Sequence, residues 1–120
     1  MVEFRGVLEE IVGSVPGSLA GMIIGKDGIP IEKYQSDRFA LDADMVGAEY
    51  AGIMAEVQKV ISILHLEDLK DVTISMKNFV VISHMISEDY YFILIINPKT
   101  DVALSRYRIR IGSLKLRELM

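Results

Sequence analysis

Apolar and polar residues change their spacing several times along this chain, and each change marks a predicted element. The first apolar residues recur at helical spacing, and Gly13 and Pro16-Gly17 then end that pattern. Strand-like runs follow, interrupted by one long helical segment. The predicted elements are a helix over 4–12, strands over 18–26 and 29–35, a helix over 42–66, strands over 72–77, 79–86 and 90–96, and a last helix that begins at Thr100 or Asp101.

The first two strands are expected to form a hairpin. Asp27 and Gly28 stand between two apolar runs, and an Asp-Gly pair favours a tight turn because both residues tolerate a positive φ. Pro30 cannot donate a backbone hydrogen bond, so the second strand is expected at an edge of the sheet. Gly28 is then required for backbone geometry, and no direct functional role is expected for it.

The long helix carries two different apolar faces. Its large side chains are predicted to cover the sheet. They are Val46, Tyr50, Ile53, Met54, Val57, Val60, Ile61 and Leu64. The small residues gather on nearly the opposite side, where they would let another helix backbone approach closely. They are Ala48, Ala51, Gly52, Ala55 and Ser62.

The last two elements differ in how clearly the pattern defines them. The run from Tyr90 to Ile96 is apolar almost throughout, as in a central strand buried on both faces. The segment around Arg106 to Ile111 alternates like a strand, yet over a longer window its apolar residues form a helical stripe. That stripe consists of Ala103, Leu104, Tyr107, Ile111 and Leu114. A helix is favoured, although Gly112 inside it is unfavourable for one.

The segment from Gly25 to Gly28 also looks like the Gly-x-x-Gly loop of K-homology domains. That loop joins two helices, and its amides and basic neighbours clamp a nucleic-acid backbone. Pro16-Gly17 and the β-branched pair Ile23-Ile24 oppose the first of those helices. Over residues 19–38, three basic residues are balanced by three acidic ones, which would give little counterion release. The hairpin is therefore favoured, and nucleic acid is disfavoured as a partner.

Composition favours a single domain over residues 1–120 that associates with another subunit. Apolar residues make up 51% of the chain and its mean hydropathy is +0.33, yet no apolar run is long enough to span a membrane. Oligomerisation would bury that surplus. The chain has no cysteine and no signal-peptide pattern, so a cytoplasmic location is expected. Residues 99–120 hold six basic and two acidic residues, which is most simply a solvated helix face.

With the hairpin accepted, nearly the whole chain resembles the roadblock/dynein light-chain family, including its MglB-like bacterial members. The resemblance rests on the element order, on Gly21-Met22-Ile23-Ile24 leading into Asp27-Gly28-Ile29-Pro30-Ile31, and on the long helix with small residues. It implies a profilin- or longin-like α/β sandwich with one five-stranded antiparallel sheet. The long helix would lie on one face and the N- and C-terminal helices on the other.

The resemblance also implies a homodimer and a partner. Long helices of two copies would pair antiparallel and their sheets would join edge to edge. The expected interface comprises Ala48, Ala51, Gly52, Ala55, Ser62, Val72, Thr73, Ile74 and Ser75. Members of this family commonly bind small Ras-like GTPases, as scaffolds or as activators.

No group of residues in the sequence has the spacing of a catalytic or metal site, and no cofactor is expected. His65 near Glu67 and Asp68 is most simply a helix end, because one histidine lacks metal-ligand spacing. His84 falls within a predicted strand and is expected to be structural. Gly13 to Ser18 lacks the Gly-Lys-Ser/Thr ending of a phosphate loop.

Two further groups contain residue types that can carry chemistry. Asp42 and Asp44 open the long helix, where carboxylates complement the dipole, and they have no acid/base partner. Arg106, Arg108 and Arg110 could supply an arginine finger but fit a solvated face better.

The sequence therefore predicts a non-catalytic homodimer that regulates or scaffolds a small GTPase. A single-stranded nucleic-acid binder that uses Lys26 and the basic last helix is one alternative. A small-ligand sensor module is another, since a profilin-like fold does not fix function.

Overall fold

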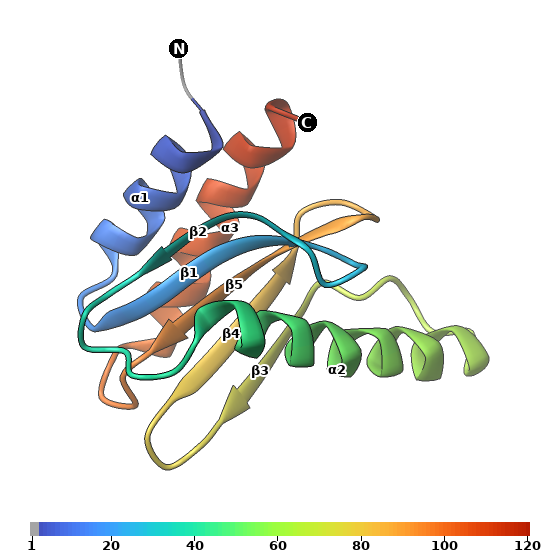
Figure 1. The fold of residues 1–120 in the computed structure, drawn as a ribbon. Coiled ribbons are helices and arrows are strands. Elements are labelled where there is room, and N and C mark those ends of the chain that lie inside the picture. Colours follow the sequence, from blue (N-terminus) through green and yellow to red (C-terminus); the bar gives the residue numbers. More distant parts are fainter. Residues whose placement is uncertain (1–2) are drawn as a thin grey trace.

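A computed structural model describes residues 3–120, and its element order is the predicted one, α-β-β-α-β-β-β-α (Figure 1). The elements are α1 (Phe4–Ser14), β1 (Ser18–Gly25), β2 (Pro30–Gln35), α2 (Ala43–Ile63), β3 (Asp71–Ser75), β4 (Val80–Met85), β5 (Tyr90–Ile96) and α3 (Val102–Glu118). None of the helices within residues 3–120 is long and apolar enough to cross a membrane.

The five strands form one antiparallel sheet in the order β2-β1-β5-β4-β3. β5 lies at the centre between β1 and β4, and helices cover both of its faces, which explains its nearly unbroken apolar sequence. β2 and β3 are the two edges. Pro30 at the start of β2 therefore lies on an edge strand, as predicted.

The hairpin between β1 and β2 is confirmed, but its turn differs from the two-residue turn that the Asp-Gly pair favours. The Gly28 N–H donates to the Gly25 carbonyl (2.9 Å), and the Gly25 N–H donates to the Ile29 carbonyl (3.0 Å). The loop therefore has three residues, of which only Gly28 has a positive φ (+87°). This is the hairpin in which a type I turn is followed by one left-handed residue, and glycine takes that position without strain. The Asp27 carboxylate accepts from the Ile29 N–H (3.0 Å) and fixes the turn.

The two faces of the sheet are covered by different helices. α1 and α3 lie side by side on one face, and α2 lies on the other (Figure 1). Alternate residues of β5 point to the two cores, so that Phe92 packs beneath α1 and α3 while Tyr91 packs beneath α2. Gly112 allows α3 to approach α1, because a β-carbon there would collide with the Ile11 side chain.

The predicted last helix is confirmed, with the Asp101 carboxylate accepting from the Leu104 N–H (3.0 Å) as its N-cap. The apolar stripe that predicts this helix, however, faces outward. Its inward side instead carries mainly small or polar residues. The buried residues are Ser105, Ile109, Gly112, Ser113 and Leu116.

The prediction that the large side chains of α2 cover the sheet is partly wrong. Ile53, Val60 and Leu64 were assigned to the sheet-facing side, and all three are exposed. The buried residues of α2 itself are Ala43, Gly47, Tyr50, Ala51 and Met54. Small residues bring the helix backbone down onto the sheet, since a β-carbon on Gly47 would lie 2.7 Å from the Met22 Sδ. The C-terminal half of α2 then extends past the sheet (Figure 1).

Candidate protein-interaction surface

An unpartnered apolar surface is formed by the outer side of α2, the edge strand β3 and the hollow between them. We call it the open surface. The start of α2 is fixed by Asp42, whose carboxylate accepts from the Asp44 N–H (2.9 Å). The N-terminal half of the helix packs on β1 through Gly47. These contacts leave the outer side of α2 facing solvent.

The hollow of the open surface is an apolar groove of about 380 Å³ between the N-terminal half of α2 and the β3–β4 hairpin. Phe39 and Phe79 meet edge to face at its end, with ring centroids 5.5 Å apart. Tyr50 also lines the groove, and its hydroxyl donates to the Val72 carbonyl (3.3 Å), which ties α2 to β3. The apolar residues that line the groove are Phe39, Leu41, Met45, Val46, Ile53, Ile74, Met76, Phe79, Val81 and Ile95.

The edge strand β3 borders this groove. Within residues 3–120 it pairs only with β4, so its other side has no strand partner. Val72 and Ile74 are half-buried toward α2, whereas Thr73 and Ser75 are exposed. An edge of this kind can accept a further strand.

Most of the predicted interface residues on α2 are accessible to a partner. Ala48, Gly52, Ala55 and Ser62 are exposed along α2. Ala51 is the exception, and its assignment to the outward face is wrong: it is only 7% exposed and packs against the hairpin turn of its own chain. A β-carbon on Gly28 would lie 3.6 Å from the Ala51 β-carbon.

Sequence reasoning also missed part of the open surface. Met45, Ile53, Val60 and Ile63 are exposed on the outer side of α2 beside the small residues. Apolar residues occur around most of this helix, and helical periodicity cannot tell which of two apolar sides meets the sheet. Nothing in the sequence pattern indicates that the C-terminal part of α2, with Val60 and Ile63, extends past the sheet and is exposed.

The Asp27-Gly28 turn lies beside α2 and is held by the neighbouring turn between β4 and β5. The Lys26 N–H donates to the Asp89 carbonyl (2.9 Å), and the Lys26 Nζ lies 3.1 Å from the Asp89 carboxylate. The K-homology alternative is wrong, because Gly25 to Gly28 connect two strands and not two helices.

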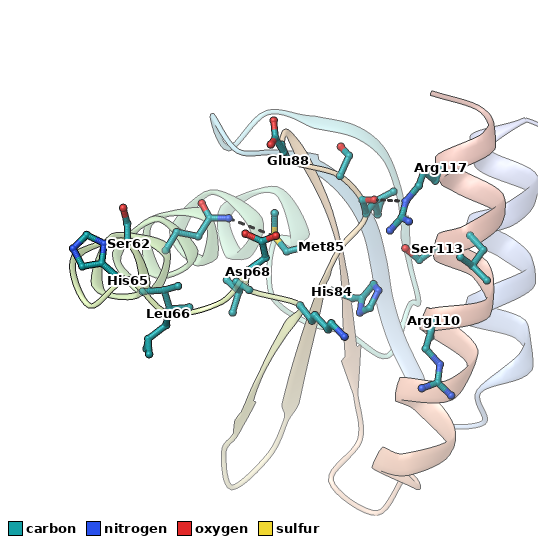
Figure 2. Close-up of a pocket in the computed structure, with 17 residues that line it drawn as sticks. Ser62, His65, Leu66, Asp68, His84, Met85, Glu88, Arg110, Ser113 and Arg117 are labelled. Carbon is teal, nitrogen blue, oxygen red and sulfur yellow. Dashed lines mark hydrogen bonds between the residues drawn. The ribbon is translucent and has the colours of Figure 1, made fainter.

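A second, larger hollow of about 900 Å³ lies between the end of α2, the end of β4 and α3 (Figure 2). Its lining mixes both charges. His65 stands at the end of α2 and His84 on β4, well apart from one another, while Arg110 and Arg117 project from α3 (Figure 2). The Arg117 Nε donates to the Ile86 carbonyl (2.9 Å). No group of three or more metal-ligating side chains occurs in the part of the chain that the structure describes.

The two histidines have different surroundings. Burial lowers the pKa of His84; Asp71 opposes that shift, and Arg117, Arg110 and Arg106 add to it. His65 is exposed and adopts a positive φ of 53° directly after α2. Its N–H donates to the Ser62 carbonyl (3.2 Å), and the Leu66 N–H donates to the Ile61 carbonyl (3.0 Å). This is the hydrogen-bond pattern of a Schellman helix end, so His65 lies in a helix-terminating position.

The family model of the Roadblock/LC7 domain matches residues 7–97, from α1 to the end of β5. The chain belongs to the Roadblock/LC7 domain family. The roadblock resemblance of the sequence is thus confirmed. No curated protein sequence matches the chain.

Solved structures agree with this assignment. Myxococcus xanthus MglC is 26% identical, with 98% of each chain covered and a TM-score of 0.71. M. xanthus MglB is 15% identical over 98% of this chain and 97% of its own, with a TM-score of 0.87. Acanthamoeba castellanii profilin II is 20% identical over 89% of this chain and 88% of its own, with a TM-score of 0.54. The profilin-like fold predicted for the chain is therefore confirmed.

Proposed function

We propose that this roadblock-domain protein is a cytoplasmic homodimer that binds a small Ras-like GTPase and regulates or scaffolds it without catalysis of its own. The dimer forms through the open surface. Its interface residues on α2 are Ala48, Gly52, Ala55 and Ser62, and those on β3 are Val72, Thr73, Ile74 and Ser75.

Two observations support the dimer: α2 exposes a row of small residues, and its other flank borders the apolar groove beside the unpaired edge of β3. Small residues let two helix backbones approach closely, and an antiparallel α2 pair would bring Gly52 and Ala55 toward the same residues of the partner. The groove of each copy would receive larger apolar side chains from the α2 helix of the other copy. Burial of apolar area supplies the main driving force, at about 25 cal/mol per Å² removed from water.

The edge strand supports the same arrangement. Hydrogen bonds from β3 to the β3 of a second copy would satisfy backbone groups that otherwise face water, and would join two sheets into one. Thr73 and Ser75 are exposed, and neither charge nor proline blocks this edge between residues 72 and 75.

The GTPase part of the proposal rests on family membership, since roadblock domains commonly bind small Ras-like GTPases. The rigid α2 face and its apolar neighbours give a protein partner a preformed surface, which reduces the entropy lost on binding.

The dimer is tested by analytical ultracentrifugation of Ala55→Arg. The wild-type protein is expected at twice 13.5 kDa and the variant at 13.5 kDa, because a buried unpaired guanidinium opposes close helix packing. Gly6→Arg is the matched control. It places the same side chain on exposed α1, on the opposite face of the sheet, and should leave the dimer intact. A monomeric wild-type protein at micromolar concentration would contradict the proposal.

The GTPase part is tested with Ras-like GTPases of the source organism, loaded with GDP or with a non-hydrolysable GTP analogue. Binding that differs between the two nucleotide states is expected, and single-turnover GTP hydrolysis with and without this protein then separates an activator from a scaffold. If the intact dimer binds none of these GTPases in either state, the dimer stands and the GTPase assignment fails.

A further inference from the structure

Helix α3 presents an apolar seam to solvent. Leu104, Tyr107, Ile111 and Leu114 follow one another at intervals of three, four and three residues, the spacing of alternating a and d positions in a heptad. Tyr107, Ile111 and Leu114 are 47%, 37% and 53% exposed. The opposite side of the helix, with Ile109 and Leu116, is buried on the sheet and α1. The seam is therefore not needed to attach α3 to its own domain.

Basic residues flank this seam on both sides. In the same heptad numbering, Arg108 and Lys115 occupy the e positions and Arg110 and Arg117 the g positions. Residues 99–120 as a whole contain six basic residues and only two acidic ones. Charges at e and g decide which helix can pair along an a/d seam.

Some of these cations are already engaged, and two are not. The Lys115 Nζ lies 2.7 Å from the Glu10 carboxylate on α1, and Arg117 donates to the Ile86 carbonyl. Arg108 and Arg110 form no ion pair within residues 3–120. Their guanidinium groups each lie 5.7 Å from the centre of the Tyr107 ring. The ring thus holds one cation close to the seam on each side.

We propose that the outer side of α3 docks an amphipathic helix of a partner protein, one whose apolar seam is flanked by aspartate and glutamate. The apolar residues would interdigitate with Tyr107, Ile111 and Leu114. The carboxylates would pair with Arg108 and Arg110 at the edges. This surface lies on the face of the sheet opposite the open surface and beyond residues 7–97 that the family model matches, so it does not depend on the proposed dimer.

Two other occupants fit the charges less well. A second copy of α3 would set its own Arg108, Arg110 and Lys115 against the same cations in either helix direction, and like charges across such a seam are unfavourable. An anionic bilayer would attract the arginines, but α1 alongside α3 carries Glu9 and Glu10, which are exposed. The seam is also only one row of side chains wide, which suits one helix better than a lipid surface.

The test uses two designed helical peptides with leucine at the seam positions, one with glutamate and one with lysine at the flanking positions. Fluorescence anisotropy should show that the glutamate peptide binds at least about tenfold more tightly, and that its affinity falls with salt. Leu114→Ser should weaken it about tenfold or more. The double variant Arg108→Glu/Arg110→Glu, which leaves two cations and two carboxylates at the flanks, should abolish the preference for the glutamate peptide. Arg38→Glu removes an exposed arginine elsewhere and should change nothing.

Several results would overturn the proposal. Equal binding of the two peptides, or binding that Leu114→Ser leaves unchanged, would show that α3 does not dock an acidic amphipathic helix through this seam. Tighter binding to phosphatidylserine vesicles than to the glutamate peptide would assign the surface to a membrane. Self-association that Leu114→Ser abolishes and Ala55→Arg does not would assign it to a second copy. Circular dichroism of each variant confirms that the fold is retained.

Discussion

On one face of the sheet α1 and α3 lie side by side and close over a core of large apolar residues, whereas on the other face α2 covers the sheet with its first half only. The first layer includes Phe92, Leu94 and Ile96 from the central strand. The second leaves a groove and an overhanging helix end. Within residues 3–120, helices thus cover one face of the sheet fully and the other face only in part.

This difference shows that exposed apolar side chains have two distinct origins here. Those on α2 are exposed because the helix extends past the sheet and leaves a groove beside β3. Those on α3 are exposed because the helix turns its small and polar side inward, where Gly112 and Ser113 permit close contact with α1 and the sheet. The first arrangement fits a second copy of the chain, and the second fits a different partner.

The largest expected difference between the layers comes from truncating one large side chain in each. Phe92→Ala should lower the free energy of unfolding by about 3–5 kcal/mol, because Phe92 is fully buried between the sheet, α1 and α3. Ile63→Ala, 64% exposed at the end of α2, should change it by less than about 0.5 kcal/mol in dilute protein. Urea denaturation followed by circular dichroism measures both. A loss of several kcal/mol for Ile63→Ala would show that the end of α2 is packed against other residues and is not exposed.

A smaller effect tests how tightly α1 and α3 pack against each other. Gly112→Ala should destabilise the protein by about 1–3 kcal/mol, because the added β-carbon collides with Ile11. Gly6→Ala on α1 adds the same methyl group where nothing lies within 4 Å, and should stabilise by about 0.5–1 kcal/mol through helix propensity. Thermal denaturation of the two variants compares them directly. If both variants were stabilised, α1 and α3 would be less closely packed than the structure indicates.

The exposed end of α2 offers a stabilising change of about 1 kcal/mol. His65 adopts a left-handed conformation that favours glycine, so His65→Gly should raise the midpoint of thermal unfolding. Lys59→Gly, in right-handed backbone four residues before the end of the helix, should lower it by a similar amount. A lower midpoint for His65→Gly would mean that α2 does not end at this position.

The smallest effect is a pH dependence of the free energy of unfolding that arises from His84 on β4. Burial lowers the pKa of His84, so the unfolded chain takes up this proton first as the pH falls. The contribution of His84 to stability is therefore complete above about pH 6.5, the ordinary histidine pKa, and is lost as the pH falls below it. The wild-type protein should lose more stability between pH 8 and pH 5 than His84→Gln. Identical pH profiles would show that the imidazole is freely solvated.

Much of the fold could be predicted from the sequence because its local signals agree with one another. The apolar run of β5, Pro30 at an edge and Asp101 before α3 each have one favourable position in an antiparallel sandwich. The prediction of a two-residue turn was wrong because an Asp-Gly pair also suits a three-residue loop, in which only Gly28 needs a positive φ. The candidate surface was predicted in part: Ala48, Gly52 and Ala55 face outward, and Ala51 does not.

The order of elements, the central strand and the family follow from the amino-acid sequence, since they depend on periodicity, turn residues and capping residues that act over a few positions. Which side of α2 and of α3 meets the sheet depends instead on packing between elements that are distant in the chain. The decisive features are contacts between distant residues: Gly47 against Met22, and Gly112 against Ile11. Each glycine lets its helix come close to the neighbouring element, while other apolar residues of the same helix face solvent. Helical spacing alone carries no information about that choice.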